Sequence, residues 1–445
     1  MTEVEKILSR VELPEIIQVR QKFDDLAMPD VAKTLTEKLN GRNLNIQPGQ
    51  RIAITCGSRG IDHYPLLVKT TVDFVKSKGA QPVLIPAMGS HGGGTAEGQT
   101  MVLHSFGITE EAMGAPILSS MEVVELGTSD RGLPVYIDKN AYECDGIILL
   151  NRVKCHTAFR GPIESGITKM TAIGLAKQKG AEYTHILGFR NMGKNILSVG
   201  KVTLAKLNIV CGIGTIEDAF GHLAEIHVLK QEEILKEEPK LLVRANELMA
   251  RFYVDESDVL IMMKQGKEVS GSGLDSNLIG RYNTPGMTGG PVFTAIGILD
   301  LSDESEGNPN GMGQGDFISK RFYDKMEIEQ AFVNCLTSTA IGTAKMPMVL
   351  ATDKMVLQAA AKFSGKPDRT QVSMIIGVST HEMGDLYMSR AALDLVPEQF
   401  KDKIETVGDF MPIPFDEKDN LCLFGWPERG IPANSRHTHA PAQGV

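Results

Sequence analysis

Apolar runs that alternate with helical patterns, and that end in glycine-rich loops, dominate the first half of the chain. Residues 51–56, 82–86 and 145–150 have the length and the bounding turns of buried strands. Between the first two, residues 64–79 carry apolar side chains at helical spacing. Strands that alternate with helices form largely parallel sheets with helices on both faces. The pattern therefore predicts an α/β fold.

The second half of the chain restarts the same pattern with an apolar strand at residues 259–263. A long charged segment at residues 226–252 precedes it, and we expect a helix whose charges face solvent and carry no chemistry. We predict two domains, residues 1–255 and 256–432, each with a largely parallel or mixed sheet flanked by helices. The active site is expected in the cleft between them, and residues 433–445 are expected to form a disordered tail.

Polar residues follow three of the predicted strands of the first half: Arg59 after the first, His91 after the second and His156 after the third. The carboxyl ends of parallel strands meet at one edge of a sheet, so these side chains can converge. Two histidines can supply an acid and a base at neutral pH, because imidazole has a pKa near about 6.5. Gly92 and Gly93 would let backbone N–H groups face an anion, although such a run is more often only a turn.

The segment of residues 151–190 adds a lysine and a histidine to this group. Lys169 lies on a helix expected at residues 165–179, where it could bind a phosphate or form a covalent link. The alternative is an exposed helix lysine. His185 could serve as a single ligand to nickel, which imidazole suits. We interpret the segment as a site that holds an anion and moves protons, with a solvated loop and a basic helix face as the alternative.

Composition restricts the partners of the chain. Its 445 residues carry a formal net charge of −9, which argues against nucleic acid as the main partner but leaves room for a local cationic pocket. We find no apolar run of the about 20 residues that a membrane span needs, and no apolar region of a signal peptide at the N-terminus. The six cysteines form no CxxC pair, so we expect a cytoplasmic protein with reduced thiols.

The order Arg59, His91, His156, Lys169, His185 resembles that of the nickel-dependent lactate racemases and their homologues. The resemblance implies a nickel-pincer nucleotide as cofactor. It also implies that His91 and His156 are the catalytic acid/base pair, that His185 is the nickel ligand, and that Lys169 holds the cofactor, covalently in some members. Arg59 would bind a carboxylate or a phosphate.

The resemblance implies a racemase or epimerase that inverts C2 of a 2-hydroxy acid by proton-coupled hydride transfer to the cofactor. Gly92 and Gly93 would contact the cofactor, and Lys320 the substrate. The loop at residues 264–281 is more polar than lactate requires, so we expect a sugar acid such as an aldonate. Two alternatives remain: a non-catalytic nucleotide- or anion-binding protein, and a nickel-independent hydroxy-acid dehydratase. The sequence leaves a homo-oligomer open.

Overall fold

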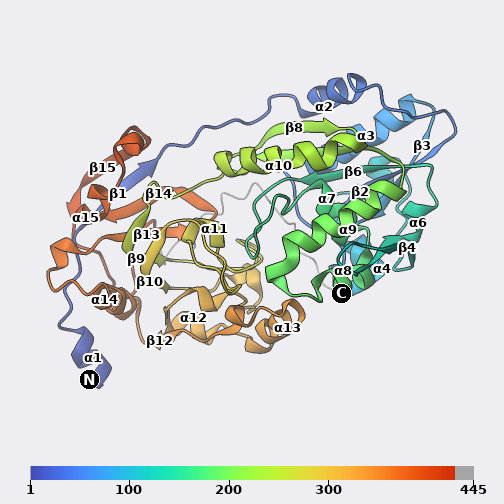
Figure 1. Cartoon of the computed structure of the whole chain (residues 1–445). Helices are drawn as coiled ribbons and strands as arrows, with labels where there is room; N and C mark the ends of the chain where they lie inside the picture. Colours follow the sequence, from blue (N-terminus) through green and yellow to red (C-terminus); the bar gives the residue numbers. More distant parts are fainter. Residues whose placement is uncertain (1, 426–445) are drawn as a thin grey trace. The chain divides into compact units, whose positions relative to one another are not determined.

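The computed structural model describes residues 2–425 and divides into two compact units (Figure 1). One unit, called here the N-terminal unit, comprises residues 25–249. The other, the C-terminal unit, combines residues 2–24 with the described residues from 250 onward. The predicted disordered tail lies outside the described residues. No helix in residues 2–425 is both long and apolar enough to cross a membrane.

The N-terminal unit contains a five-stranded sheet whose first four strands are parallel. The fifth strand pairs antiparallel with its neighbour, so the sheet is mixed. In spatial order the strands are β3 (Gln81–Pro86), β2 (Arg51–Cys56), β6 (Gly146–Arg152), β7 (Ile209–Glu217) and β8 (Leu223–Leu229). The predicted α/β fold and the three predicted strands are confirmed.

Helices cover both faces of this sheet because its strands are apolar on both sides. In β6, Ile147 and Leu149 belong to one hydrophobic core, while Ile148 and Leu150 belong to the other. The first core includes residues of α7 (Ile167–Lys169), α9 (Met192–Lys206) and α10 (Gln231–Leu248). The second includes residues of α2 (Val31–Asn40), α3 (Tyr64–Ser77), α4 (Ala96–Ser105) and α5 (Glu110–Met113).

A separate antiparallel hairpin of β4 (Val123–Thr128) and β5 (Pro134–Asp138) precedes β6. It leads into α6 (Lys139–Tyr142).

The single helix expected at residues 165–179 is broken into three pieces. These are α7, a π-helical turn at Met170–Gly174, and α8 (Lys177–His185). A Cβ atom on Gly174 would lie 2.6 Å from the carbonyl oxygen of Ala87 at the end of β3, so the backbone approaches too closely for a regular helix with a side chain here. Lys177 then has a φ of 54°. Single π-helical turns of this kind are frequent at functional sites.

The C-terminal unit is built on an eight-stranded mixed sheet with the order β12-β11-β10-β9-β13-β14-β1-β15. The five strands from β12 to β13 are parallel and the remaining pairs are antiparallel. Their bounds are Met348–Leu350, Phe317–Ser319, Val292–Ile298, Glu256–Met262, Met374–Ser379, Glu382–Ser389, Ile16–Gln21 and Ile404–Met411. Its helices are α1 (Glu3–Leu8), α11 (Ser276–Ile279), α12 (Lys320–Asp324), α13 (Ile328–Ser338), α14 (Asp353–Phe363) and α15 (Arg390–Asp394).

Strand β1 lies in this second sheet, although the sequence pattern assigns residues 1–255 to the first domain. It pairs with β14 and β15, whose residues follow it by more than 360 positions. Pairing over such a distance leaves no trace in local hydrophobic periodicity, so the pattern does not show which sheet the strand joins.

Candidate functional site

The loops that follow β2, β3 and β6 all begin at one edge of the N-terminal sheet. Strand β2 lies between the other two and pairs parallel with both, with Cys56 opposite Pro86 and Ile54 opposite Ile148. Neighbouring strands are about 4.8 Å apart, so the loops that carry His91 and His156 start about 10 Å apart. Arg59 follows the strand between them. The three strands therefore end at the same edge of the sheet, and the convergence of the three side chains stays a prediction.

The loop that carries His156 is organised around a buried carboxylate. Lys154 and Ser165 close the loop through two backbone hydrogen bonds. Inside it, the carboxylate of Glu164 accepts from the backbone N–H of His156 at 2.7 Å and from that of Gly161 at 3.2 Å. Glu164 is only 4% exposed. These bonds fix the backbone of His156 directly.

The ring of His156 has a defined tautomer. Its Nδ1 atom accepts from the backbone N–H of Ala158 at 3.0 Å, so the proton of the neutral ring is on Nε2. The ring stacks on Phe159 with centroids 4.1 Å apart. Burial, and next the charge of Lys169, lower the pKa of His156 well below its usual value. His156 is therefore a neutral N–H donor at neutral pH.

His185, the last residue of α8, has the opposite tautomer. Its Nδ1 lies 2.6 Å from the carbonyl oxygen of Ala181, which can only accept, so the lone pair is on Nε2. Metal-binding histidines commonly donate their other N–H to such a carbonyl. Burial lowers the pKa of His185, which favours the neutral form that a metal needs. Phe189 lies 5.6 Å from this ring and 6.4 Å from that of His156, so one aromatic side chain joins the two histidines.

Lys169 lies at the end of α7 beside the same aromatic group. Its Nζ atom is 5.6 Å from the ring centroid of Phe159. Burial, followed by the charges of Arg59 and Lys154, lowers the pKa of Lys169 to about 7. At neutral pH a large share of this side chain is the neutral amine, which is the nucleophilic form.

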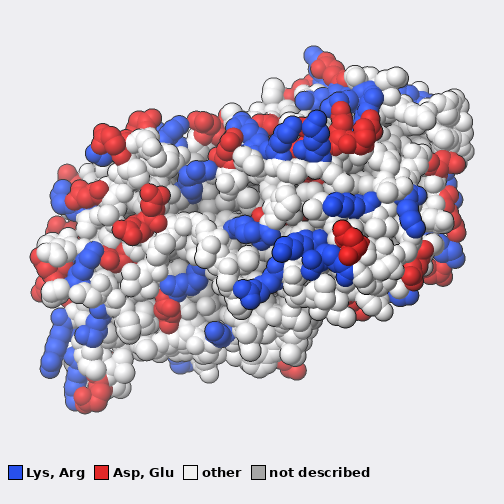
Figure 2. Space-filling model, viewed as in Figure 1, with Lys and Arg blue, Asp and Glu red and all other residues white. Residues whose placement is uncertain are grey.

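Positive charge gathers around Lys169 without equal negative charge. Desolvation, and next the charge of Arg152, lower the pKa of Arg59, although part of its side chain remains in contact with solvent. Arg152 forms an ion pair with Glu217. Among residues 2–425, neither Arg59 nor Lys169 forms an ion pair with a carboxylate. The cluster of Arg59, Lys154 and Lys169 favours an anion, either a phosphate or a carboxylate. Separately from this cluster, Figure 2 shows Lys and Arg side chains on the surface over α9.

His91 lies on an exposed turn after β3. Its Nδ1 is 2.9 Å from the carbonyl oxygen of Met88, so Nδ1 carries a proton, and in the neutral ring Nε2 carries the lone pair. The backbone N–H of Gly89 donates to Gly174 at 3.1 Å, which ties the turn to the π-helical segment. The loops that carry His91 and His156 follow β3 and β6, which lie on either side of β2. That the two rings act as a pair stays a prediction.

Gly92 and Gly93 form a tight turn with φ values of 64° and 65°. A Cβ atom on Gly92 would lie 2.6 Å from the backbone nitrogen of Gln99, so this glycine permits close packing on α4. A Cβ atom on Gly93 would meet nothing within 4 Å. Their contact with a cofactor stays a prediction.

Lys320, the predicted substrate contact, lies in the C-terminal unit at the start of α12. It is exposed and forms an ion pair with Asp324, one turn further along the helix. Pairs at this spacing are common on helix surfaces. Its role toward a substrate stays a prediction.

One residue of the site contradicts the sequence interpretation. We expected the charges of the helix now seen as α10 to face solvent, but Glu238 is only 1% exposed. Its carboxylate accepts from the backbone N–H of Thr168 at 3.0 Å and from its hydroxyl at 2.5 Å, at the start of the helix that carries Lys169. Burial raises the pKa of Glu238 to about 7. Its spacing from Ile234 and Leu241 within the apolar stripe was the missed signal.

Two aromatic residues of the site were also missed. Phe159 stacks on His156, and Phe189 contacts both histidines. Each follows one of these histidines by three or four positions in the sequence. That spacing alone carries no chemistry, so only the fold reveals the aromatic group.

The N-terminal unit is thus an α/β unit with cations and histidines in the loops that follow its strands. Comparison with known families gives a more particular result: residues 46–196 match the family described as the lactate racemase N-terminal domain. This segment contains all the predicted site residues of the N-terminal unit. Residues 46–196 therefore belong to that family, and the resemblance seen in the sequence is confirmed.

Comparison with solved structures finds the lactate racemase apoprotein from Thermoanaerobacterium thermosaccharolyticum. The two chains are 12% identical, with a TM-score of 0.45, and the match covers 88% of this chain and 96% of that one. No curated protein sequence matches the chain significantly.

Proposed function

We propose that the chain is an isomerase that inverts C2 of a 2-hydroxy acid with the help of a nickel-pincer nucleotide. The observation that carries this proposal is the pair of opposite tautomers, with a lone pair on Nε2 of His91 and a proton on Nε2 of His156. One ring can accept a proton while the other donates a hydrogen bond, and the pair then carries one additional positive charge, on His91. The lactate racemase family of residues 46–196 supports the class of reaction.

The residues of the site fit a metal ion that receives most of its ligands from an organic cofactor and one from the protein. His185 offers Nε2, and its Nδ1–H is already bonded to Ala181. Within residues 2–425, the group of three or more metal-binding side chains lies elsewhere in the same unit, at Asp25, Asp218 and His222. A single imidazole binds a metal weakly, so nickel at His185 would need donors from an organic cofactor.

The cations of the site fit the phosphate of such a cofactor. Arg59 and Lys154 would bind it through charge-assisted hydrogen bonds. Lys169, with its pKa near about 7, offers either a charged ammonium group for an ion pair or a neutral amine for covalent attachment. When bound, the cofactor supplies the hydride acceptor that a 2-hydroxy acid needs, because its C2–H is too weakly acidic for simple deprotonation.

The side chains of this unit would then perform the proton transfers. Nε2 of His91 accepts the proton of the substrate hydroxyl group, and Nε2–H of His156 donates a hydrogen bond to the oxygen at C2. Arg59 would bind either the substrate carboxylate or the cofactor phosphate, and Lys154 would bind the phosphate in both cases. In the reverse direction the two rings exchange roles, which requires Nδ1 of His156 to release the N–H of Ala158.

For the substrate we propose a polyhydroxy acid, such as an aldonate, rather than lactate. The support is the composition of residues 264–281, which are more polar than lactate requires.

The test uses the full chain, loaded with cofactor and nickel, and single enantiomers of lactate, malate, an aryl-lactate and an aldonate in D2O. We expect inversion of one class with the C2 hydrogen retained, because a hydride does not exchange with solvent. His91→Gln and His156→Gln should each lower the rate at least about 100-fold. Binding of the nucleotide without inversion of any acid would instead identify a nucleotide-binding protein.

A further inference from the structure

Lys177 is a completely buried lysine that belongs to no part of the predicted site. Its Nζ donates to the carbonyl oxygen of Pro86 at 2.5 Å and to Oε1 of Gln99 at 3.1 Å. It also forms an ion pair with Asp138 at 3.1 Å. A buried ammonium group is costly unless its hydrogens are bonded, and here three acceptors surround it.

The lysine determines the orientation of the neighbouring amide. An ammonium group can only donate, so the oxygen of the Gln99 side chain faces Lys177 and its NH2 group faces the other way. That NH2 group donates to the carbonyl oxygens of Gly89 at 2.9 Å and of His91 at 3.3 Å. Gln99 is fully buried, so no solvent competes for these bonds. The turn that carries His91 is therefore held by a side chain whose direction Lys177 sets.

The same lysine is fixed to the helix that carries the other histidine. Lys177 is the first residue of α8, which ends at His185. Its partner Asp138 donates its backbone N–H to the carbonyl oxygen of Leu175 at 2.6 Å, immediately before that helix. One buried network thus connects the turn of His91 with the start of α8.

A gain in stability does not explain this ion pair. Replacement of both Lys177 and Asp138 with apolar residues of similar volume is often neutral or stabilising, whereas replacement of Lys177 alone leaves the carboxylate of Asp138 buried without its partner and is destabilising. The distinctive property of the pair is directional, since each hydrogen bond fixes one backbone segment at a defined place.

We propose that Lys177, acting through Gln99, is a positioning residue that fixes the imidazole of His91 relative to the helix of His185. This inference rests on the proposed function of His91 as a catalytic base. Without the lysine, the amide of Gln99 loses its fixed direction and the turn at residues 88–91 loosens. A ring displaced by about 1 Å is sufficient to slow proton transfer strongly.

The test compares Gln99→Met, Lys177→Met and the double variant with Lys201→Met, an exposed lysine on α9. Hydrogen–deuterium exchange of the peptide that covers residues 87–95 should accelerate at least about ten-fold in the first three, through local opening. Their kcat for inversion should fall about 10–100-fold while KM stays within about three-fold. The double variant should lose no more than the worse single variant, because both substitutions break one connection. Lys201→Met should match the wild type.

Unchanged exchange of this peptide in both single variants would overturn the proposal, and so would additive losses in the double variant. Should Lys177→Met fail to fold, Gln99→Glu decides the question. It keeps an acceptor for Lys177 but offers no donor to Gly89 or His91, so exchange should accelerate in a folded protein. If the wild type inverts no acid, the proposed function fails, while the exchange measurements still decide whether Lys177 holds the turn.

Discussion

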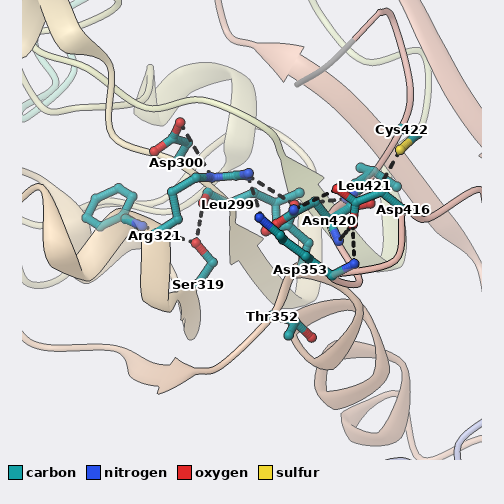
Figure 3. A network of polar contacts seen from close by, with 12 residues as sticks. Leu299, Asp300, Ser319, Arg321, Thr352, Asp353, Asp416, Asn420, Leu421 and Cys422 are labelled. Atoms are coloured by element: carbon teal, nitrogen blue, oxygen red, sulfur yellow. Dashed lines mark hydrogen bonds and ion pairs between the residues drawn. The ribbon is translucent and has the colours of Figure 1, made fainter. Parts of the chain in front are cut away.

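Cations in the two units differ in whether carboxylates pair with them. In the C-terminal unit, Arg321 forms ion pairs with Asp353 at 3.0 Å and with Asp300 at 3.6 Å, in a network that Figure 3 shows from close by. In the N-terminal unit, Arg59 and Lys169 have cationic neighbours, and no carboxylate among residues 2–425 forms an ion pair with them.

The difference indicates that the charges around Arg321 stabilise the fold, whereas those around Lys169 favour the binding of an anion. Asp353 also accepts from the backbone N–H of Leu421 at 3.0 Å, so the network around Arg321 joins distant segments of the C-terminal unit. Every charge in it is compensated. Around Lys169 the protein carries an electrostatic cost that a bound anion would offset, and such uncompensated groups are typical of binding sites. The comparison predicts that substitutions in the two clusters change stability in opposite directions.

The largest effect is expected for Arg321→Met. Removal of the guanidinium leaves the buried carboxylate of Asp353 without its ion-pair partner and Asp300 with Lys325 alone, so the free energy of unfolding should fall by about 3 kcal/mol. Urea unfolding of the C-terminal unit measures the loss. Lys320→Met, at an exposed neighbouring position, is the control and should change stability by less than about 0.5 kcal/mol. Equal changes in the free energy of unfolding for Arg321→Met and Lys320→Met would contradict the view that the ion pairs of Arg321 stabilise this unit.

Lys169→Met should have the opposite sign and raise the free energy of unfolding by about 1–2 kcal/mol at pH 7. The pKa of Lys169 is about 7 in the folded chain and about 10.4 when unfolded, so between these values the unfolded chain binds more protons. The cost is complete below pH 7 and disappears as the pH rises toward 10. The gain should therefore shrink over that range. A loss of stability at pH 7 would contradict the account of the cluster.

The same substitution should also raise the pKa of His156 and of His185, because the charge of Lys169 lowers both. Two-dimensional NMR of the imidazole resonances measures this directly. In the wild type, His156 should not titrate between pH 6.5 and pH 8, since burial keeps its pKa well below 6.5. Lys201→Met should leave the pKa of both histidines unchanged. A change of either pKa in this variant would show that the effect does not come specifically from the charge of Lys169.

The smallest effect is expected for Glu238→Gln. Burial raises the pKa of Glu238 from 4.5 to about 7, so its contribution to stability is complete below about pH 4.5 and is lost as the pH rises through 7. The neutral amide removes this dependence and keeps an acceptor for Thr168. We expect a change below about 1 kcal/mol at pH 7, with the variant gaining relative to the wild type at pH 8. Glu238→Leu, which keeps no acceptor, should be clearly less stable.

Much of the site could be predicted from the sequence because it lies in local patterns. The parallel strands β2, β3 and β6 are short apolar runs bounded by turns, and Arg59, His91 and His156 follow them directly. Lys169 and His185 share one continuous segment with His156. Order along the chain is sufficient to place these residues in one region of the sheet.

The remaining features depend on contacts that local patterns do not contain. The break before Lys177 arises from the close approach of Gly174 to Ala87. Gln99 and Glu238 are polar residues at buried helix positions, and only their tertiary partners make such positions favourable. The tautomers of the histidines likewise depend on single backbone groups that the fold supplies.

The central claim is that His91 and His156 present opposite proton states to a substrate placed between their loops. Nitrogen-15 NMR of the imidazole groups at pH 7, with resonances assigned through His91→Gln and His156→Gln, tests it most directly. The account predicts a neutral ring with the proton on Nδ1 for His91 and a neutral ring with the proton on Nε2 for His156. The same tautomer in both rings, or a protonated His156 at pH 7, would contradict it.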